Sequence, residues 1–277
     1  MRENSYIAEI LQFALSLADL AERQILPVYR NCSVTLKSDG SDVTEADRSA
    51  EKAMREIIGK RFPDHAILGE EFGGARPDPR QPAWVLDPID GTTSFAIGVP
   101  LFGTLIGYLE KGEPVAGVIH FPAMGETVFA AQNLGCWSRL RGGTPKRVQV
   151  APAKGIREAF VSACSAGPSD IHPALEQPCY KMSALIPLVR KFRFITDCMQ
   201  HALVAQGRID AALDLIMHPW DIAAIVPCVE EAGGVVTDLD GVREGIVWRP
   251  SLLTSSNRRL HDQILDSLNG RRRRFDL

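Results

Sequence analysis

The most informative part of the sequence is Trp84-Val85-Leu86-Asp87-Pro88-Ile89-Asp90-Gly91-Thr92. Its apolar start predicts a strand that ends at Asp87, and Pro88 keeps Asp87 extended because a residue before proline avoids the α region. Asp90 follows after a tight turn, and Gly91 permits a conformation or a close approach that a side chain would block. A short helix can begin at Thr92, and its free N–H groups would face the same place as the two carboxylates. The stretch therefore predicts a site where two acids meet an anion-binding backbone.

The same stretch also has a purely structural interpretation. An Asp-Gly turn is common in proteins, and Asp90 can simply cap the helix that follows. Taken alone, Asp90-Gly91 favours this interpretation, whereas the complete nine-residue pattern favours a functional site.

Further acidic positions lie far away in the sequence. Glu70 and Glu71 follow a short apolar segment, Asp47 lies in a predicted helix, and Asp221 directly precedes another. Each has a structural alternative. Glu71, and less so Glu70, could be a solvated turn acid, and Asp47 could be a surface acid. Asp221 could cap its helix by accepting from the N–H groups of residues 223 and 224.

Several carboxylates in one cleft repel one another, and some would stay protonated unless cations intervene. Mg²⁺ removes this conflict, since it binds through a few carboxylates together with substrate phosphate. Two such ions about 3.5–4 Å apart form a clamp for phosphoryl displacement. The sequence has no HxxxH or CxxC pair, no GxSxG motif and no GxxxxGK[ST] loop. These absences argue against a zinc site, a serine hydrolase and a P-loop enzyme.

Composition limits the remaining classes. The chain has 277 residues, of which 45% are hydrophobic and 23% charged, and its net charge is −3. This excludes a disordered polyelectrolyte and argues against a protein that holds nucleic acid by bulk charge. No apolar run approaches the roughly 20 residues of a membrane helix, and acidic residues interrupt the N-terminus where a signal peptide would be apolar. Six scattered cysteines indicate reduced thiols in a cytoplasmic protein.

Apolar spacing predicts the elements of the first half. An amphipathic helix spans residues 4–29, and a second runs from Thr44 to about Arg61, with Thr44 and Asp47 in a capping-box-like arrangement. Short strands follow, punctuated by Gly and Pro, which favours a largely antiparallel sheet. The predicted strands are 66–68, 84–86, 102–109, 115–121 and 127–131.

The second half alternates between the two kinds of element, which indicates α/β layering. Strands are predicted at 160–163, 192–195, 211–215, 235–238 and 252–255, and helices at about 174–190, 198–206, 221–232 and 257–268. Gly and Pro are frequent at about 140–157, which suits a domain boundary. We therefore expect an N-terminal α+β domain at 1–145 with most metal ligands, and a C-terminal α/β domain at 146–277 that supplies Asp221 and the substrate pocket.

Taken together, these motifs resemble the inositol monophosphatase family of Mg²⁺-dependent phosphomonoesterases. The resemblance covers nearly the whole chain and is far more specific than any single motif. It is carried by the stretch at 87–92, by Gly69-Glu70-Glu71, by Trp220-Asp221, by Lys37-Ser38-Asp39, by Asp42-Val43-Thr44-Glu45-Ala46-Asp47, and by Glu230-Glu231-Ala232-Gly233-Gly234 with Asp238. It implies an αβαβα sandwich, commonly a homodimer, with two or three Mg²⁺ ions in each active site.

The resemblance also implies roles for individual residues. Glu70, Asp87 and the carbonyl of Ile89 would hold one metal, and Asp87, Asp90 and Asp221 a second. Glu70 and Thr92, the latter paired with Asp47, would position and deprotonate the attacking water. The backbone N–H groups of Gly91 and Thr92 would receive the phosphate.

Three places are more similar to the histidinol-phosphate phosphatase branch of the family than to inositol enzymes. They are Ser94-Phe95, Pro100-Leu101-Phe102-Gly103-Thr104-Leu105-Ile106, and Asp197-Cys198. The resemblance also places Asp214 where a Glu contacts inositol hydroxyls. Histidinol phosphate carries an ammonium group near neutral pH, and carboxylates at Asp197 and Asp214 could pair with it. Against this, Met199-Gln200-His201 departs from the aromatic residue more often found in that branch, and Asp197 could instead cap the following helix.

Three functions follow as hypotheses. The first is hydrolysis of histidinol phosphate, with Asp197, Cys198 and Asp214 as substrate contacts. The second is an inositol-1-phosphate phosphatase or a broad sugar-phosphate phosphatase with the same mechanism. The third is a regulatory binding protein. The expected partners are a small phosphorylated substrate and a second copy of the chain, with no nucleic acid and no membrane.

Overall fold

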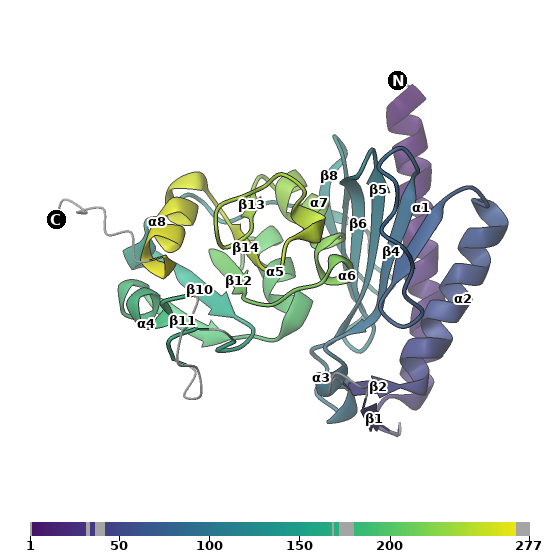
Figure 1. Ribbon diagram of the computed structural model, residues 1–277, viewed down its shortest axis with the longest axis horizontal. Helices are drawn as coiled ribbons and strands as arrows, with labels where there is room; N and C mark the ends of the chain where they lie inside the picture. Colours follow the sequence, from purple (N-terminus) through teal and green to yellow (C-terminus); the bar gives the residue numbers. More distant parts are fainter. Residues whose placement is uncertain (1, 32–33, 37–41, 168, 172–179, 270–277) are drawn as a thin grey trace.

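The computed structural model describes residues 2–31, 34–36, 42–167, 169–171 and 180–269. The chain forms an αβαβα sandwich, and this confirms the predicted layering (Figure 1). Helices α1 (Arg2–Ile25) and α2 (Glu45–Arg61) cover the outer face of a seven-stranded sheet. Helices α5 (Asp197–Ala205), α6 (Pro219–Ile222) and α7 (Ile225–Glu231) form the middle layer. A five-stranded sheet follows, and α4 (Met182–Leu185) and α8 (Arg258–Leu268) cover its far side.

The first sheet runs in chain order. Its strands are β3 (Ala66–Gly69), β4 (Ala83–Asp90), β5 (Gly103–Glu110), β6 (Glu113–Phe121), β7 (Glu126–Ala131), β8 (Gly135–Leu140) and β9 (Lys146–Val148). Only β3 and β4 pair in parallel, so the prediction of a largely antiparallel sheet is confirmed. Strands β8 and β9 were not predicted. The residues of β8 show no clear polar–apolar alternation, and two of the three residues of β9 are exposed and charged.

The second sheet has the order β11-β10-β12-β14-β13 and mixes parallel with antiparallel pairs. Its strands are β10 (Phe160–Ala163), β11 (Lys191–Phe194), β12 (Ala211–Asp214), β13 (Val235–Thr237) and β14 (Leu252–Ser255). All five lie within a residue of their predicted positions. The first sheet ends at Val148 and the second begins at Phe160, and a domain division at 145/146 stays a prediction.

Smaller elements complete the chain. Strands β1 (Val34–Leu36) and β2 (Asp42–Thr44) form a short antiparallel pair, and α3 (Thr92–Ala96) follows β4. Within the described part of the chain, 3₁₀ segments lie at Leu26–Val28, Ile156–Glu158, Ile186–Leu188 and Ile246–Trp248. Among the described residues, no helix combines the length and the apolar character needed to cross a membrane.

Prolines explain why some predicted helices are wrong in length. The helix predicted to reach residue 29 ends at Ile25 and continues as a 3₁₀ turn, since Pro27 has no N–H for the helical ladder. The helix predicted at 221–232 is two helices, because Pro227 cannot donate to the carbonyl of Ala223. Of the helix predicted at 174–190, residues 174–179 lie outside the described residues, and α4 with its 3₁₀ extension occupies 182–188.

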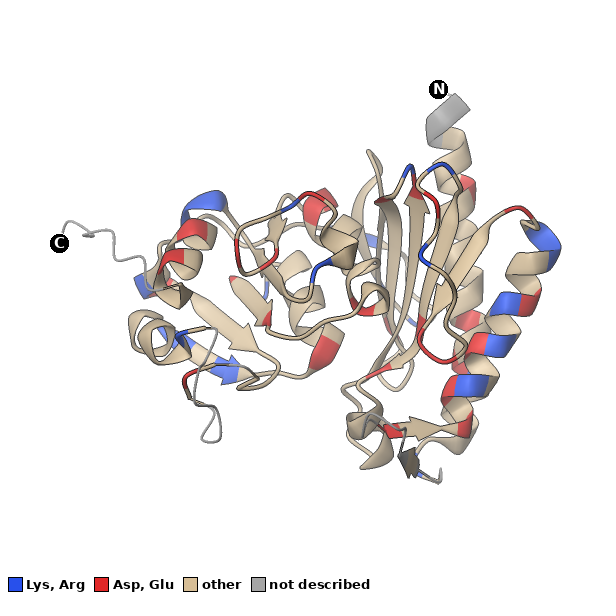
Figure 2. Ribbon diagram, in the orientation of Figure 1, with Lys and Arg blue, Asp and Glu red and all other residues tan. Residues whose placement is uncertain are grey.

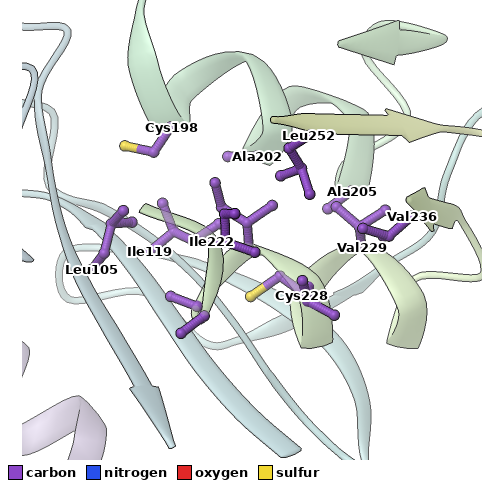
Figure 3. Close-up of a cluster of buried hydrophobic side chains, with 14 of the residues drawn as sticks. Leu105, Ile119, Cys198, Ala202, Ala205, Ile222, Cys228, Val229, Val236 and Leu252 are labelled. Carbon is purple, nitrogen blue, oxygen red and sulfur yellow. The ribbon is translucent and has the colours of Figure 1, made fainter. Parts of the chain in front are cut away.

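Apolar side chains join the layers. In the central cluster, Leu105 and Ile119 of the first sheet pack towards Ile222 and Val229 of the middle helices (Figure 3). Gly117 on β6 permits a close approach, since a Cβ there would lie 2.1 Å from the carbonyl oxygen of Ala224. The middle helices are thus pressed against the sheet, and this fixes α6 near the end of β4.

Candidate active site

Strand β4 brings Asp87 and Asp90 together through a β-bulge. Asp87 pairs with Leu105 and Asp90 pairs with Gly103, so three steps along β4 match two along β5. Side chains three residues apart in a regular strand point to opposite faces, and one extra residue returns them to the same face. The predicted turn between the two acids is therefore wrong. The strand continues to Asp90, and the bulge brings the two carboxylates to the same face of the sheet.

Gly91 and Thr92 follow directly. Gly91 has φ +85°, a left-handed conformation that favours glycine, and it is the N-cap of α3. The hydroxyl of Thr92 donates to the carbonyl of Ile89 at 3.0 Å, and it lies 3.4 Å from Asp47 Oδ1. The predicted pairing of Thr92 with Asp47 thus has its two partners side by side.

Asp47 is held by the start of its own helix. Its Oδ2 accepts from the backbone N–H of Thr44 at 2.8 Å and from the Thr44 hydroxyl at 2.5 Å, and Thr44 Oγ1 in turn accepts from Ala46 N. This is the predicted capping arrangement, and Asp47 is fully buried. The interpretation of Asp47 as a surface acid is therefore wrong.

Asp221 reaches the same place from the middle layer. Its Oδ2 accepts from the backbone N–H of His218 at 2.7 Å, because α6 begins two residues earlier than predicted, at Pro219. Asp221 therefore lies inside the first turn and does not cap residues 223 and 224. Oxygens of Asp87, Asp90 and Asp221 all lie within 4.8 Å of one another. Figure 2 shows acidic positions where β4, α5 and α6 approach each other.

Burial and mutual repulsion raise the pKa values of these acids. Burial raises the pKa of Asp87 well above its ordinary value, and the charges of Glu70, Asp90 and Asp221 add to it. Burial, with Asp197 and Asp221 nearby, likewise raises the pKa of Asp90. The pKa of Asp221 rises to about 8, chiefly through burial. Such a cluster is costly unless a cation neutralises it.

One buried oxygen points to the nature of that cation. Asp87 Oδ1 is shielded from solvent and has no hydrogen-bond partner. A buried polar atom of this kind needs a partner, and a bound cation can be that partner. Carboxylate oxygens without sulfur or imidazole are the ligands that hard divalent cations prefer. The residues present therefore fit a Mg²⁺-like ion.

Glu70 approaches the cluster from β3. Its backbone N–H donates to Leu86 O at 3.1 Å, which ties the end of β3 to β4. Its charge contributes to raising the pKa values of Asp87, Asp221 and Asp47. Glu70 is not one of the three acids whose oxygens all lie within 4.8 Å of each other, so it borders the cluster.

Asp197 closes the site from the start of α5. Its φ of +51° is unusual for a residue with a side chain. The Cys164 thiol lies 3.5 Å from both the backbone N and Oδ1 of Asp197. A Cβ on Gly91 would lie 2.6 Å from Asp197 Oδ2, so this carboxylate rests against the Gly91 backbone. Burial, with Asp214 nearby, raises the pKa of Asp197 to about 6.

The alternative that Asp197 caps α5 is not observed. Thr196 occupies the N-cap position, and Asp90 Oδ2 accepts from the backbone N–H of Cys198 at 2.6 Å. The Cys198 side chain is buried in the central cluster (Figure 3). Its thiol, like its backbone N–H, interacts with the Asp90 carboxylate.

Asp214 lies behind Asp197 at the end of β12. Its Oδ2 lies 2.7 Å from Gln200 Nε2 and 2.9 Å from His201 Nε2. This network and the contact of Cys164 with Asp197 could not be predicted from the sequence, because residues from different elements form them. Contacts of Asp197, Cys198 and Asp214 with a substrate stay predictions.

Comparisons with known proteins agree with this geometry. Residues 7–272 match the model of the inositol monophosphatase family. The chain is 38% identical to the histidinol-phosphatase of Chlorobaculum parvum, over 95% of this chain and 98% of that one. It is 35% identical to the histidinol-phosphatase of Mycobacterium tuberculosis, over 94% and 97% of the two chains. The solved structure of the Thermotoga maritima IMPase superposes with a TM-score of 0.79 at 28% identity, over 95% and 97% of the chains.

Proposed function

Because the chain belongs to the inositol monophosphatase family, we propose that it hydrolyses histidinol phosphate to histidinol and phosphate with Mg²⁺ as its metal. The family and the relatives are phosphatases, so the chain is a phosphoric monoester hydrolase. The family is also metal-dependent, in keeping with the acidic cluster at Asp87, Asp90 and Asp221.

The acids would hold two or three Mg²⁺ ions. Glu70, Asp87 and the Ile89 carbonyl would bind one, and Asp87, Asp90 and Asp221 another. The unpartnered Asp87 Oδ1 supports this assignment, because Asp87 belongs to both sets. When bound, Mg²⁺ offsets the charge of the phosphate dianion, lowers the pKa of a bound water and stabilises the leaving alkoxide.

The remaining residues handle the water and the phosphate. Asp47 would accept a hydrogen bond from the Thr92 hydroxyl, which leaves the Thr92 oxygen free to accept a hydrogen bond from the attacking water and so position it. The Thr44 contacts hold Asp47 for this role. Glu70 would orient and deprotonate the same water, and the N–H groups of Gly91 and Thr92 would receive the phosphate. Water attacks in line with the leaving oxygen, so no covalent enzyme intermediate is needed.

One observation carries the choice of substrate: the Asp197 carboxylate rests against the Gly91 backbone, with Asp214 behind it. A carboxylate beside the phosphate position would pair with a cationic group on the alcohol part of the substrate, which neutral inositol lacks. Histidinol phosphate supplies an ammonium group, and its imidazole can also protonate. The histidinol-phosphatase relatives support the same choice.

A panel of phosphate esters tests this proposal with the variant Asp197→Asn. The wild-type protein with Mg²⁺ is expected to prefer histidinol phosphate over inositol 1-phosphate. The variant should lose roughly 10- to 100-fold in kcat/KM for histidinol phosphate, since a hydrogen bond to a charged group contributes about 1.5–3 kcal/mol. Its activity on inositol 1-phosphate should fall much less.

The exposed Asp262 provides a matched control, because Asp262→Asn removes the same charge far from the acids. Equal losses on both substrates would contradict a role for Asp197 in substrate choice. A wild-type preference for inositol 1-phosphate, or equal rates on several sugar phosphates, would favour the second hypothesis. A regulatory binding role would be supported if a variant without catalytic activity still performed the cellular role of the wild-type protein.

Two further parts of the proposal concern assembly and location. A homodimer would cover Phe194, which is 53% exposed on the edge strand β11 and packs edge-on against Phe192. A cytoplasmic location agrees with the free thiols of the four cysteines that lie within the described residues.

A further inference from the structure

Helix α2 carries a second buried acid, Glu51, one turn after Asp47. Asp47, Glu51 and Arg55 follow one another at intervals of four and therefore share one face of the helix. Glu51 has no exposed surface. A carboxylate buried to this degree is stable only if it is paired and hydrogen-bonded.

Its partners lie in the turn that carries Glu70. Glu51 Oε2 accepts from the backbone N–H of Glu71 at 2.7 Å, and Oε1 accepts from that of Phe72 at 3.2 Å. Glu51 Oε1 also accepts from Arg55 Nε at 2.7 Å. Both carboxylate oxygens are thus used, and two of their three donors come from the residues immediately after Glu70.

Arg55 holds the same turn from its other end. Its Nη2 donates to the carbonyl of Gly73, and its guanidinium lies over the Phe72 ring, 6.0 Å from the ring centre. Gly73 O also accepts from Gly69 N at 3.1 Å. The turn 69–73 is therefore bound at both ends: Glu51 accepts from two of its backbone N–H groups, and Arg55 donates to its last carbonyl.

Gly69 shows how closely the helix meets the turn. A Cβ at this position would lie 2.1 Å from Glu51 Oε1 and 2.5 Å from the carboxyl carbon. Only glycine lets the carboxylate lie directly against the residue before Glu70. The turn has little freedom to move while the Glu51 side chain is in place.

We propose that Glu51, braced by Arg55, is a positioning residue that holds Glu70 at the metal site. Glu70 is repelled by Asp87 and Asp221, so a free turn would let its carboxylate swing away from them. Fixing the turn on α2, the helix that also carries Asp47, places both groups relative to β4. This inference rests on the proposed function only in taking Glu70 as a metal ligand.

The substitution Glu51→Gln tests the proposal. A glutamine of the same shape would point its NH₂ group at one of the N–H donors, and the turn should shift. Substituting a residue that orients a metal ligand typically lowers metal affinity by about 10- to 100-fold. We expect a loss of this size in Mg²⁺ affinity, measured by calorimetric titration and as the Mg²⁺ concentration for half-maximal activity. At saturating Mg²⁺, kcat should change far less.

Matched controls lie on the same helix. Glu56→Gln removes an exposed negative charge and should leave Mg²⁺ affinity unchanged. Arg55→Gln removes the brace without burying a new donor against the turn, and should weaken Mg²⁺ binding several-fold. Lys52→Gln removes an exposed positive charge and is its control. The Arg55 variant keeps the proposal testable if Glu51→Gln fails to fold, which circular dichroism would reveal.

The outcomes separate this proposal from the proposed function. If the wild-type protein binds no Mg²⁺, the proposed function fails. If the wild type binds Mg²⁺ and both Glu51→Gln and Arg55→Gln bind it equally well, the positioning role of Glu51 is wrong. Loss of kcat at saturating Mg²⁺ with unchanged affinity would also overturn it.

Discussion

Replacing Asp90 by Asn is expected to lower kcat by at least about 10²–10³-fold, the loss typical of removing one preorganised electrostatic group. The substitution removes one negative charge from a set of acids whose oxygens lie within 4.8 Å of each other. A metal that shares these ligands would bind more weakly, and its effect on the water and the phosphate would fall with it. Phosphate release at several Mg²⁺ concentrations measures the loss.

The fold should survive this change. Asp90 Oδ2 accepts from the backbone N–H of Cys198, and an asparagine oxygen can accept the same hydrogen bond. Circular dichroism should therefore match the wild type. Asp64→Asn removes an exposed charge and should leave the rate unchanged. Activity of Asp90→Asn close to that of the wild type would contradict the assignment of Asp90 to the metal site.

Removing the metal is expected to make the protein less stable as the pH rises. Asp221 has an ordinary pKa of 3.8 in the unfolded chain, and burial raises the pKa to about 8 in the metal-free fold. Between these values the folded state binds more protons than the unfolded state, so the free energy of unfolding falls with increasing pH. The expected loss is on the order of 1–3 kcal/mol.

Two comparisons make this measurable by thermal unfolding in a chelator at several pH values. Asp221→Asn cannot ionise, so its metal-free stability should depend less on pH than that of the wild type. Mg²⁺ at 100 times its Kd should stabilise the wild type by about 2.7 kcal/mol and should help the variant far less. A variant with the wild-type pH dependence and the wild-type response to Mg²⁺ would refute the account of the cluster.

These predictions express one trade-off. Asp87, Asp90 and Asp221 destabilise the metal-free fold, because they are like charges removed from water. The same repulsion gives the site its affinity for a divalent cation. A substitution that removes one of these charges should therefore lower the activity and raise the free energy of unfolding of the metal-free protein.

The acids themselves were predictable from the sequence, and their geometry was predictable only in part. Asp87, Asp90 and Asp221 come together as expected, because an apolar strand and a helix start deliver them. The capping arrangement of Thr44 and Asp47 was predictable, because it depends only on residues three positions apart in the chain. The bulge between Asp87 and Asp90 was missed, since it depends on the pairing of β4 with β5.

Contacts between distant segments could not be predicted. In the sequence, nothing distinguishes Glu51 from other acidic residues of a helix. Its proposed role depends on its contact with the turn at 69–73, which lies about 20 residues further along the chain. Asp197 likewise has a left-handed conformation and contacts Cys164 and Gly91, which lie far from it in the sequence. The break caused by Pro227 was visible in the sequence, since a proline interrupts the helical ladder wherever its missing N–H is needed.

Carboxylates from separate segments are expected to form one metal site. Anomalous diffraction from crystals soaked in Mn²⁺, a scattering substitute for Mg²⁺, tests it most directly. The account predicts a Mn²⁺ peak between Asp87, Asp90 and Asp221, which disappears in Asp90→Asn or loses most of its height. Saturating Mn²⁺ with no peak among these three side chains, or with ions bound only elsewhere, would contradict it.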